Sequence, residues 1–260
     1  MRLRCLAVLL LAIPTLSFGQ NLAKRDSAGV SVLREMLTQT GWHRALLPID
    51  ARAVGDITVY DNDGGILTTG TIEIRTRGPK KFAIQTNLQG EEATSVYSER
   101  FAIRKSGTER MQVPARTLSP ILLPVFADWW DVDDGTWGVE YQGLDVVNSQ
   151  PVHRIRLWRE LPVTDPRYEE VRRGSPVTIW ISQSESLPVQ IEYRKASFEN
   201  RLAFATYVRQ FSDFRKVKNR LLPFRHDEWV LGKRLRSIRF RDIDTDVGVD
   251  GAEFELKGGN

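Results

Sequence analysis

The chain has 260 residues, of which 41% are apolar and 27% are charged, with 37 basic side chains against 33 acidic ones. This composition suits one large folded domain or two small ones, and it excludes a disordered chain, a collagen, a coiled coil and a disulfide scaffold. A single cysteine, Cys5, and three histidines exclude a zinc site built from cysteine and histidine.

The N-terminal segment predicts a secretory signal peptide. Two arginines precede an apolar run from Leu6 to Leu16, which is about half as long as a membrane-spanning helix, and small residues follow it. We expect cleavage after Gly19, so that residues 1–19 are the signal peptide and residues 20–260 form the mature protein. Because the cysteine precedes the apolar run, we expect no lipid attachment at a processed cysteine.

Removing the signal peptide leaves 35 basic and 33 acidic residues and no cysteine. A nearly neutral chain without thiols suits an oxidising compartment, so we expect a periplasmic protein that is not integral to a membrane after cleavage. The weak net charge also argues against a nucleic-acid partner.

The first predicted element of the mature chain is a helix over residues 27–40. Its apolar residues Val30, Leu33, Met36 and Leu37 recur at helical spacing, and a glycine follows directly as a stop signal. A single apolar face indicates that this helix docks onto a larger structure.

After Pro48 the apolar residues mostly alternate with polar ones, which predicts β-strands. Aspartates and glycines at 61–65 predict a hairpin turn. Because one side of each strand is apolar and the other is polar or charged, we predict a mainly β protein with a single curved antiparallel sheet or open barrel. Roughly ten or eleven strands are expected, around residues 57–59, 72–77, 82–85, 101–103, 137–141, 155–157, 177–181, 189–193, 202–208, 235–240 and 254–256.

Residues 119–130 break this alternation. The segment contains Pro124, ends in two tryptophans and is apolar nearly all round, which predicts a short buried helix. No linker, repeat or low-complexity tract divides the chain, so we predict one domain over residues 20–260.

Three stretches resemble the LolA/LolB-like superfamily of periplasmic lipoprotein carriers and their relatives. Ile74–Phe82 resembles the family's strand that ends in Arg-Pro, and Val177–Ile191 resembles its paired strands around a Leu-Pro turn. Phe211–Pro223 is similar to a late segment of lipoprotein-sorting-like proteins. The likeness extends over most of residues 27–256. It implies an α+β fold in which a half-open antiparallel sheet is covered, on an apolar concave face, by the N-terminal helix and the central apolar helix.

The resemblance also implies that the concave face forms a cavity for acyl chains, with the central helix as a lid. Arg77 matches the family's arginine that holds the lid closed, although Gly78 is inserted before Pro79. The alternatives are an outward arginine that pairs with a neighbouring acid, and an ordinary packed core in place of the cavity. The predicted cavity residues are Ile72, Ile74, Phe82, Ile84, Phe101 and Ile103, and the predicted lid residues are Leu122, Leu123, Phe126, Trp129 and Trp130.

Two groups of acidic residues could be mistaken for metal sites. The first group has the spacing of an EF-hand loop, but Val247 occupies the place where that loop needs a glycine, so we predict a charged strand followed by a turn. The second group is typical of a solvated turn that leaves a helix, with weak binding of a divalent cation as the alternative. The first consists of Asp242, Asp244, Asp246, Asp250 and Glu253, and the second of Asp128, Asp131, Asp133 and Asp134. We expect no metal and no cofactor.

The sequence contains no nucleophile elbow, no zinc-protease motif and no phosphate-binding glycine loop, so we predict no catalytic residue. His43, His153 and His226 are interpreted as structural or surface residues. The arginine runs at 154–159 and 234–241 predict cross-strand ion pairs on the convex face, with a docking surface for acidic partners or lipid headgroups as the alternative.

Two functions follow from these expectations. The first is a non-enzymatic periplasmic carrier or chaperone of the cell envelope, which binds a lipid or a lipoprotein acyl chain and has envelope proteins as further partners. The alternative is a protein-interaction or envelope-stress-sensing module of the same fold without a small-molecule ligand.

Overall fold

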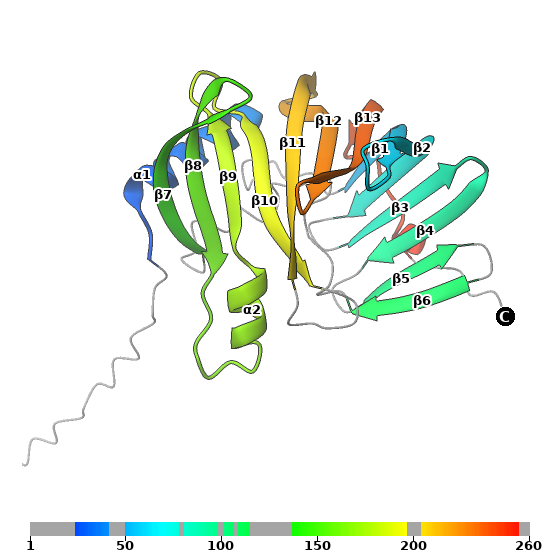
Figure 1. Cartoon of the computed structure of the whole chain (residues 1–260), viewed down its shortest axis with the longest axis horizontal. Helices are drawn as coiled ribbons and strands as arrows, with labels where there is room; N and C mark the ends of the chain where they lie inside the picture. Colours follow the sequence, from blue (N-terminus) through cyan, green and yellow to red (C-terminus); the bar gives the residue numbers. More distant parts are fainter. Residues whose placement is uncertain are drawn as a thin grey trace, which may run out of the picture.

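The computed structural model describes residues 24–41, 50–77, 81–97, 101–106, 109–114, 137–196 and 204–254. Within these ranges the protein is mainly β, with one antiparallel sheet of thirteen strands and two α-helices, α1 (Ser27–Thr40) and α2 (Tyr168–Gly174). The sheet curves into an open half-barrel (Figure 1). The predicted fold class is therefore confirmed, whereas the predicted central helix at 119–130 lies outside the described residues. In the described part of the chain, no helix is both long enough and apolar enough to cross a membrane.

The sheet is an antiparallel meander whose first and last strands pair with each other. Its order from edge to edge is β6-β5-β4-β3-β2-β1-β13-β12-β11-β10-β9-β8-β7. Because β1 pairs with β13 in the middle, the consecutive strands β6 and β7 become the two edges. The strands are β1 (Asp50–Tyr60), β2 (Ile66–Arg77), β3 (Lys81–Leu88), β4 (Glu91–Tyr97), β5 (Phe101–Ser106), β6 (Glu109–Pro114), β7 (Trp137–Val147), β8 (Gln150–Arg159), β9 (Val177–Ser182), β10 (Pro188–Ala196), β11 (Phe204–Val217), β12 (Arg220–Val230) and β13 (Lys233–Thr245).

Helix α1 forms where the sequence predicts it. At its start the Asp26 carboxylate accepts a hydrogen bond from the Ala28 N–H, and at its end Gly41 adopts the left-handed conformation with a φ of 75°. Its apolar residues, among them Leu33 and Met36, are buried, and the helix lies against β7 and β12.

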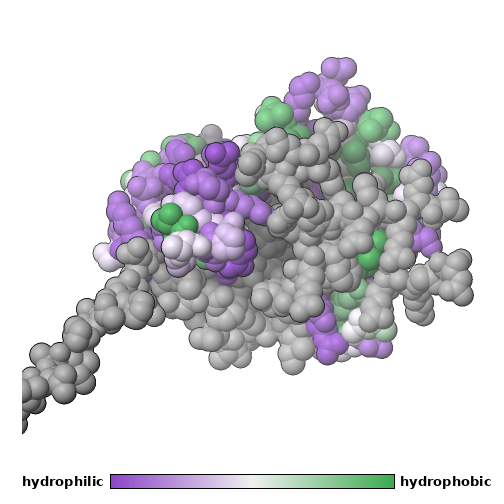
Figure 2. Space-filling model, turned by 90° about the horizontal axis from the view of Figure 1, so that it is seen from below, coloured by the Kyte–Doolittle hydropathy of each residue, from purple (hydrophilic) through white to green (hydrophobic). Residues whose placement is uncertain are grey.

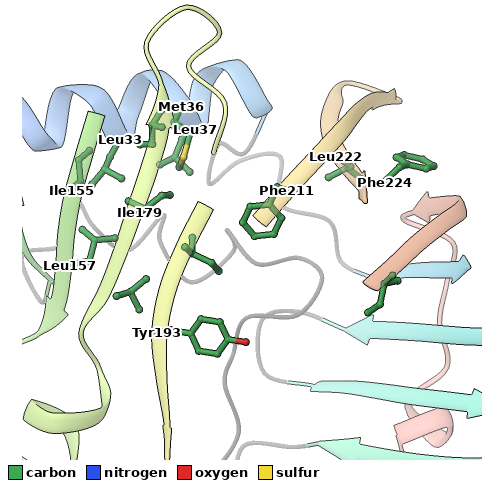
Figure 3. Close-up of a cluster of buried hydrophobic side chains, with 14 of the residues drawn as sticks. Leu33, Met36, Leu37, Ile155, Leu157, Ile179, Tyr193, Phe211, Leu222 and Phe224 are labelled. Carbon is green, nitrogen blue, oxygen red and sulfur yellow. The ribbon is translucent and has the colours of Figure 1, made fainter. Parts of the chain in front are cut away.

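Alternation along the strands divides the sheet into two faces. We call the face that packs against α1 the concave face and the opposite one the convex face. On the concave face, Ile57 lies opposite Ile238 and Ile74 lies opposite Ile84. Side chains from α1 and from the strands on both sides of the half-barrel converge here (Figure 3). The concave face therefore holds the main hydrophobic core.

A smaller apolar cluster lies on the convex face, under the C-terminal turn. Ala83 and Val96 face each other across β3 and β4, and they cluster with Val249 and Phe254. The turn is fixed by Asp50, whose carboxylate accepts hydrogen bonds from three successive backbone N–H groups. Seen from below, the described surface is mainly hydrophilic, with apolar residues in small separate groups (Figure 2).

The described residues contain more strands than the sequence pattern predicts. Alternation does not reveal β4 and β6, which contain few apolar residues, or β12, where neighbouring apolar residues and Pro223 hide the period of two. Helix α2 is not predicted either, since it buries no residue and has no apolar face. The strand predicted at 254–256 is wrong, because Gly251–Phe254 forms a short 3-10 helix, η4, with Phe254 packed on the convex face.

The predicted hairpin turn between β1 and β2 is confirmed. Asp61 Oδ1 accepts hydrogen bonds from the N–H groups of Asp63 and Gly65, at 2.9 and 2.8 Å. Gly64 adopts a φ of 86°, a conformation that favours glycine.

Candidate functional site

The concave face carries an extended apolar surface from β13 to β3. It is built from alternate positions of each strand, so each strand contributes one apolar side. Such a surface can hold an acyl chain, since burial stabilises the bound chain by roughly 0.8 kcal/mol per methylene. The buried residues of this surface are Ile57, Ile72, Ile74, Ile238 and Phe240, and Ile84 packs beside them.

A charged cluster lies on the same face in the middle of the sheet. It consists of Arg209 on β11, Glu228 on β12 and Arg236 on β13, which face one another across neighbouring strands, and we call it the concave triad. Glu228 Oε1 lies 3.2 Å from Arg209 Nη2. Arg236 Nε donates a hydrogen bond to Glu228 Oε2 at 2.5 Å, and the Tyr193 hydroxyl donates to Oε1 at 2.5 Å. Both oxygens of the carboxylate are thus bound.

The concave triad is removed from water to different degrees. The side chains of Arg209 and Glu228 are only 2% and 3% exposed, whereas that of Arg236 is 23% exposed. Burial works against the charge of Arg236, but the Glu228 carboxylate beside it raises the pKa of its guanidinium. Burial also raises the pKa of the Tyr193 hydroxyl, so this phenol is neutral at pH 7.

His226 lies next to the concave triad on β12. Its ring packs edge-on against Phe211 and Phe240, and its Nε2 is 3.2 Å from the carbonyl oxygen of Pro223. Burial lowers the pKa of His226 to about 3, so the ring is neutral at pH 7. These contacts support its interpretation as a structural residue.

The other two histidines lie away from the concave triad or outside the described residues. His153 lies on β8, where its Nδ1 is 2.9 Å from the Tyr141 hydroxyl. His43 lies outside the described residues.

Four of the predicted cavity residues come together on the concave side of β2 and β3. Ile72, Ile74 and Phe82 are buried, and Ile84 packs against the core. Phe82 also stacks on Tyr97 of β4, with the ring centroids 4.2 Å apart.

The prediction that Ile103 shares this face is wrong. Ile103 faces Val96 across β4 and β5, and Val96 faces Ala83, so all three lie on the convex face. The pattern of β5 is out of phase with that of β2, which the sequence of either strand alone does not indicate. Phe101 begins β5 and pairs with Pro114, but its side chain lies outside the described ones.

Arg77, the predicted lid contact, lies on the opposite face of the sheet from the four buried cavity residues of β2 and β3. Arg77 alternates with Thr76 and Ile74, which places it on the convex face. It lies beside the C-terminal segment: a Cβ added to Gly251 would be 3.0 Å from Arg77 Nη1. The side chain therefore does not face the space over the concave side. The predicted lid residues Leu122, Leu123, Phe126, Trp129 and Trp130 lie outside the described residues.

The sequence interpretation missed the concave triad. Its signal is a charge that is two residues from a buried neighbour on the same strand: Arg209 from Phe211, Glu228 from His226, and Arg236 from Ile238. The prediction that the run 234–241 lies on the convex face is therefore wrong for Arg236.

Other members of the arginine runs do form ion pairs away from the concave triad. Arg234 contacts Asp227, and Arg241 Nε lies 3.8 Å from Asp56 Oδ1. Between β7 and β8, Arg154 Nη1 lies 4.0 Å from Asp145 Oδ2. Cross-strand ion pairing is thus confirmed for these arginines.

The carboxylates with EF-hand-like spacing divide between β13 and the segment that follows it. Asp242 and Asp244 are exposed positions on β13, and Asp246 lies 3.2 Å from Arg220 Nη1. Among the described residues, no group of acidic, histidine or cysteine side chains could hold a metal ion. The group Asp128, Asp131, Asp133 and Asp134 lies outside these residues.

A second arginine–glutamate–arginine group lies on the convex face, and we call it the convex triad. Glu73 Oε1 accepts hydrogen bonds from Arg52 Nε at 2.6 Å and from Arg75 Nε at 2.7 Å. Together with residues 247–249, it lines a cleft of about 250 Å³. Although burial works against it, hydrogen bonds from both arginines lower the pKa of Glu73.

Comparison with known proteins supports the fold. The sequence matches no family model and no curated protein. Three solved structures are similar over nearly their whole length. A DUF1329 family protein from Desulfovibrio piger has 13% identity and a TM-score of 0.58, and the match covers 90% of this chain and 98% of that protein.

The other two structures carry names that agree with the resemblance. A LolA superfamily protein from Nitrosomonas europaea has 9% identity and a TM-score of 0.57, with 87% and 97% covered. A putative outer membrane lipoprotein-sorting protein domain from Vibrio parahaemolyticus has 11% identity and a TM-score of 0.55, with 88% and 96% covered. The chain therefore has a LolA-like fold.

Proposed function

We propose that this protein is a non-enzymatic carrier or chaperone of the periplasm, which binds the acyl chain of a lipid or lipidated protein against its concave face. The observation that carries the proposal is the apolar concave face of a sheet whose edges, β6 and β7, do not pair with each other. An open sheet gives a flexible chain a side from which to reach this face. The LolA-like fold is consistent with such a role.

A specific observation favours the alternative of a protein-interaction or stress-sensing module. The protein's own atoms bury Ile72 and Ile74, which are 3% and 2% exposed. If the protein's own side chains fill the interior permanently, the same fold presents only its outer surface to a protein partner.

Native mass spectrometry of the mature protein, residues 20–260, separates these functions. The carrier predicts a co-purified lipid, or uptake of a fluorescent fatty-acyl probe by the empty protein. An empty protein that takes up no acyl probe would contradict the carrier and leave the protein-interaction module.

Two matched variants locate the site. Thr86 lies on the concave side of β3, opposite Ile72, and Thr94 lies on the convex side of β4, opposite Gln85; both are half-buried. Thr86→Phe should reduce probe uptake by occupying the space of the chain, whereas Thr94→Phe should leave it unchanged. Equal uptake by both variants would place the acyl chain elsewhere.

A further inference from the structure

We infer that the protein binds the anionic end of an acyl ligand where β7 begins, between the indole N–H of Trp137 and the guanidinium of Arg159. This inference rests on the proposed acyl-chain binding and names the position and the chemistry of the ligand's polar end. Three observations carry it: a buried indole N–H, an arginine stacked on the same indole, and the main core beside both.

Trp137 holds a buried donor that has no acceptor. The residue is 6% exposed and belongs to the main core, yet its Nε1 has no hydrogen-bond partner among the described residues. Two indoles of the convex face differ from it. Trp158 Nε1 donates to Glu160 Oε2 at 2.7 Å. Trp180 Nε1 donates to Asp145 Oδ2 at 2.9 Å. Because a buried N–H without an acceptor is costly, Trp137 is the indole that a bound acceptor would stabilise.

Arg159 brings a positive charge to the same place. It lies opposite Trp137 across β7 and β8, and its Cζ is 5.2 Å from the centre of the indole ring. This stacking favours a position of the cation beside the indole donor. Arg159 is exposed, and within the described part of the chain no carboxylate forms an ion pair with it, whereas Arg154 of the same strand lies near Asp145.

The two side chains define the chemistry of the ligand. An indole and a guanidinium can only donate hydrogen bonds, so the ligand must present an acceptor, and the charge of Arg159 favours an anion such as a carboxylate or a phosphate. Val139 and Leu157 form the next row on the same face, and both are fully buried in the main core. Apolar side chains thus lie directly beside the donors, which favours an amphiphile over a free inorganic anion.

The proton of the Trp137 indole reports on this site, because its resonance moves downfield when the N–H donates a hydrogen bond. The mature protein is labelled with nitrogen-15, its indole resonances are assigned through bonds, and laurate, dodecyl phosphate or 1-dodecanol is added below its aggregation concentration. We expect both anionic ligands to shift the Trp137 resonance downfield. The resonances of Trp158 and Trp180 should stay in place, because these N–H groups already have acceptors. Acetate at the same concentration should shift none, since it lacks the chain.

The dissociation constants should follow the same chemistry. Laurate and dodecyl phosphate should bind at least about tenfold more tightly than 1-dodecanol, because a hydrogen bond to a charged group contributes at least that factor. The tighter of the two identifies the headgroup as a carboxylate or a phosphate. Arg159→Gln should abolish the preference and keep the affinity for 1-dodecanol, with its fold checked by circular dichroism. The matched control is Arg156→Gln, an exposed convex position on the same strand, which should keep the full preference.

The outcomes separate this inference from the proposed function. If 1-dodecanol binds but the anionic ligands gain nothing, if the Trp137 resonance stays in place, or if Arg159→Gln keeps the preference, the inference is wrong and the carrier stands. A downfield shift with acetate alone would replace the amphiphile by a free anion and would also overturn the inference. If none of the three chain-bearing ligands binds the wild-type protein, the carrier itself is contradicted, and the inference with it.

Discussion

The protein contains two triads of the same composition, an arginine–glutamate–arginine group on each face of the sheet. In the convex triad, Arg52 is 56% exposed and Glu73 is 20% exposed, so water screens the ion pairs. In the concave triad, Arg209 and Glu228 are almost fully buried. Two arginines and one glutamate are thus a solvated group on one face and a largely desolvated charge cluster in an apolar core on the other.

This difference shows that the effect of such a group on stability depends on the face where it lies and not on its composition. Burying ions costs several kcal/mol per ion unless geometry and additional hydrogen bonds compensate for the loss of water, which Tyr193 helps to do here. A charge cluster maintained at that cost in the middle of the concave face is a stronger indication of binding than the exposed triad is.

The largest predicted effect comes from removing the centre of the concave triad. Glu228→Gln leaves the buried Arg209 and the partly exposed Arg236 without their shared carboxylate, and it should lower the free energy of unfolding by about 3–5 kcal/mol. Urea denaturation at pH 7 measures this loss. A loss below about 1 kcal/mol would mean that the concave triad is as well solvated as the convex one.

A substitution in the main core measures how firmly apolar side chains pack on the concave face. Leu33 on α1 is 1% exposed and packs in the main core (Figure 3). Leu33→Ala should lower the free energy of unfolding by about 3 kcal/mol through lost burial and a cavity. A much smaller loss in urea denaturation would indicate that α1 is not packed firmly on the concave face.

His226 reports on the polarity next to the concave triad. Its pKa is about 3 in the folded protein and about 6.5 in the unfolded chain, so between these values only the unfolded chain takes up the proton. Proton uptake by the unfolded chain favours unfolding. The free energy of unfolding therefore keeps its full value above pH 6.5 and falls as the pH decreases, by about 2–3 kcal/mol between pH 6.5 and pH 4.5.

The variant His226→Phe isolates this contribution from that of the carboxylates. Its stability should fall less steeply than that of the wild type over the same pH range, as measured by urea denaturation at several pH values. Parallel pH profiles would show that His226 is protonated as easily in the folded protein as in the unfolded chain.

The smallest effect is expected on the convex face. Glu73→Gln removes the shared carboxylate of the convex triad and should cost less than about 1 kcal/mol, because exposed ion pairs contribute little. The same urea denaturation experiment serves as the matched control for Glu228→Gln. Equal losses for the two variants would remove the distinction between the faces.

Much of the fold could be predicted from the sequence, because it is encoded locally. The spacing of apolar residues and the glycine at its end locate α1 to the residue, and alternation identifies most strands of the sheet. Strands such as β4 are not predicted because they contain few apolar residues, so no alternation is visible in their own sequence. They form strands because they pair with their neighbours in the sheet. The turn that precedes the 3-10 helix at Phe254 is held by Asp50, which is about 200 residues away in the chain.

The candidate site could be predicted only in part, since a face is a property of the whole sheet. The shared face of Ile72, Ile74 and Ile84 can be predicted from the alternation within their strands. The face of Ile103 depends on how β5 is aligned with β4, which the sequence does not indicate. The concave triad combines residues from β11, β12 and β13, and only their register brings the three charges together.

The central claim, that the concave face binds an acyl chain, is tested most directly by nuclear magnetic resonance with a nitroxide-labelled fatty acid. The mature protein is labelled with carbon-13 at its isoleucine methyl groups, and the line broadening caused by the spin label is measured for each. We expect strong broadening for Ile57, Ile72 and Ile238 on the concave face and much weaker broadening for Ile103 on the convex face. Broadening at Ile103 alone, or at no isoleucine, would contradict the central claim.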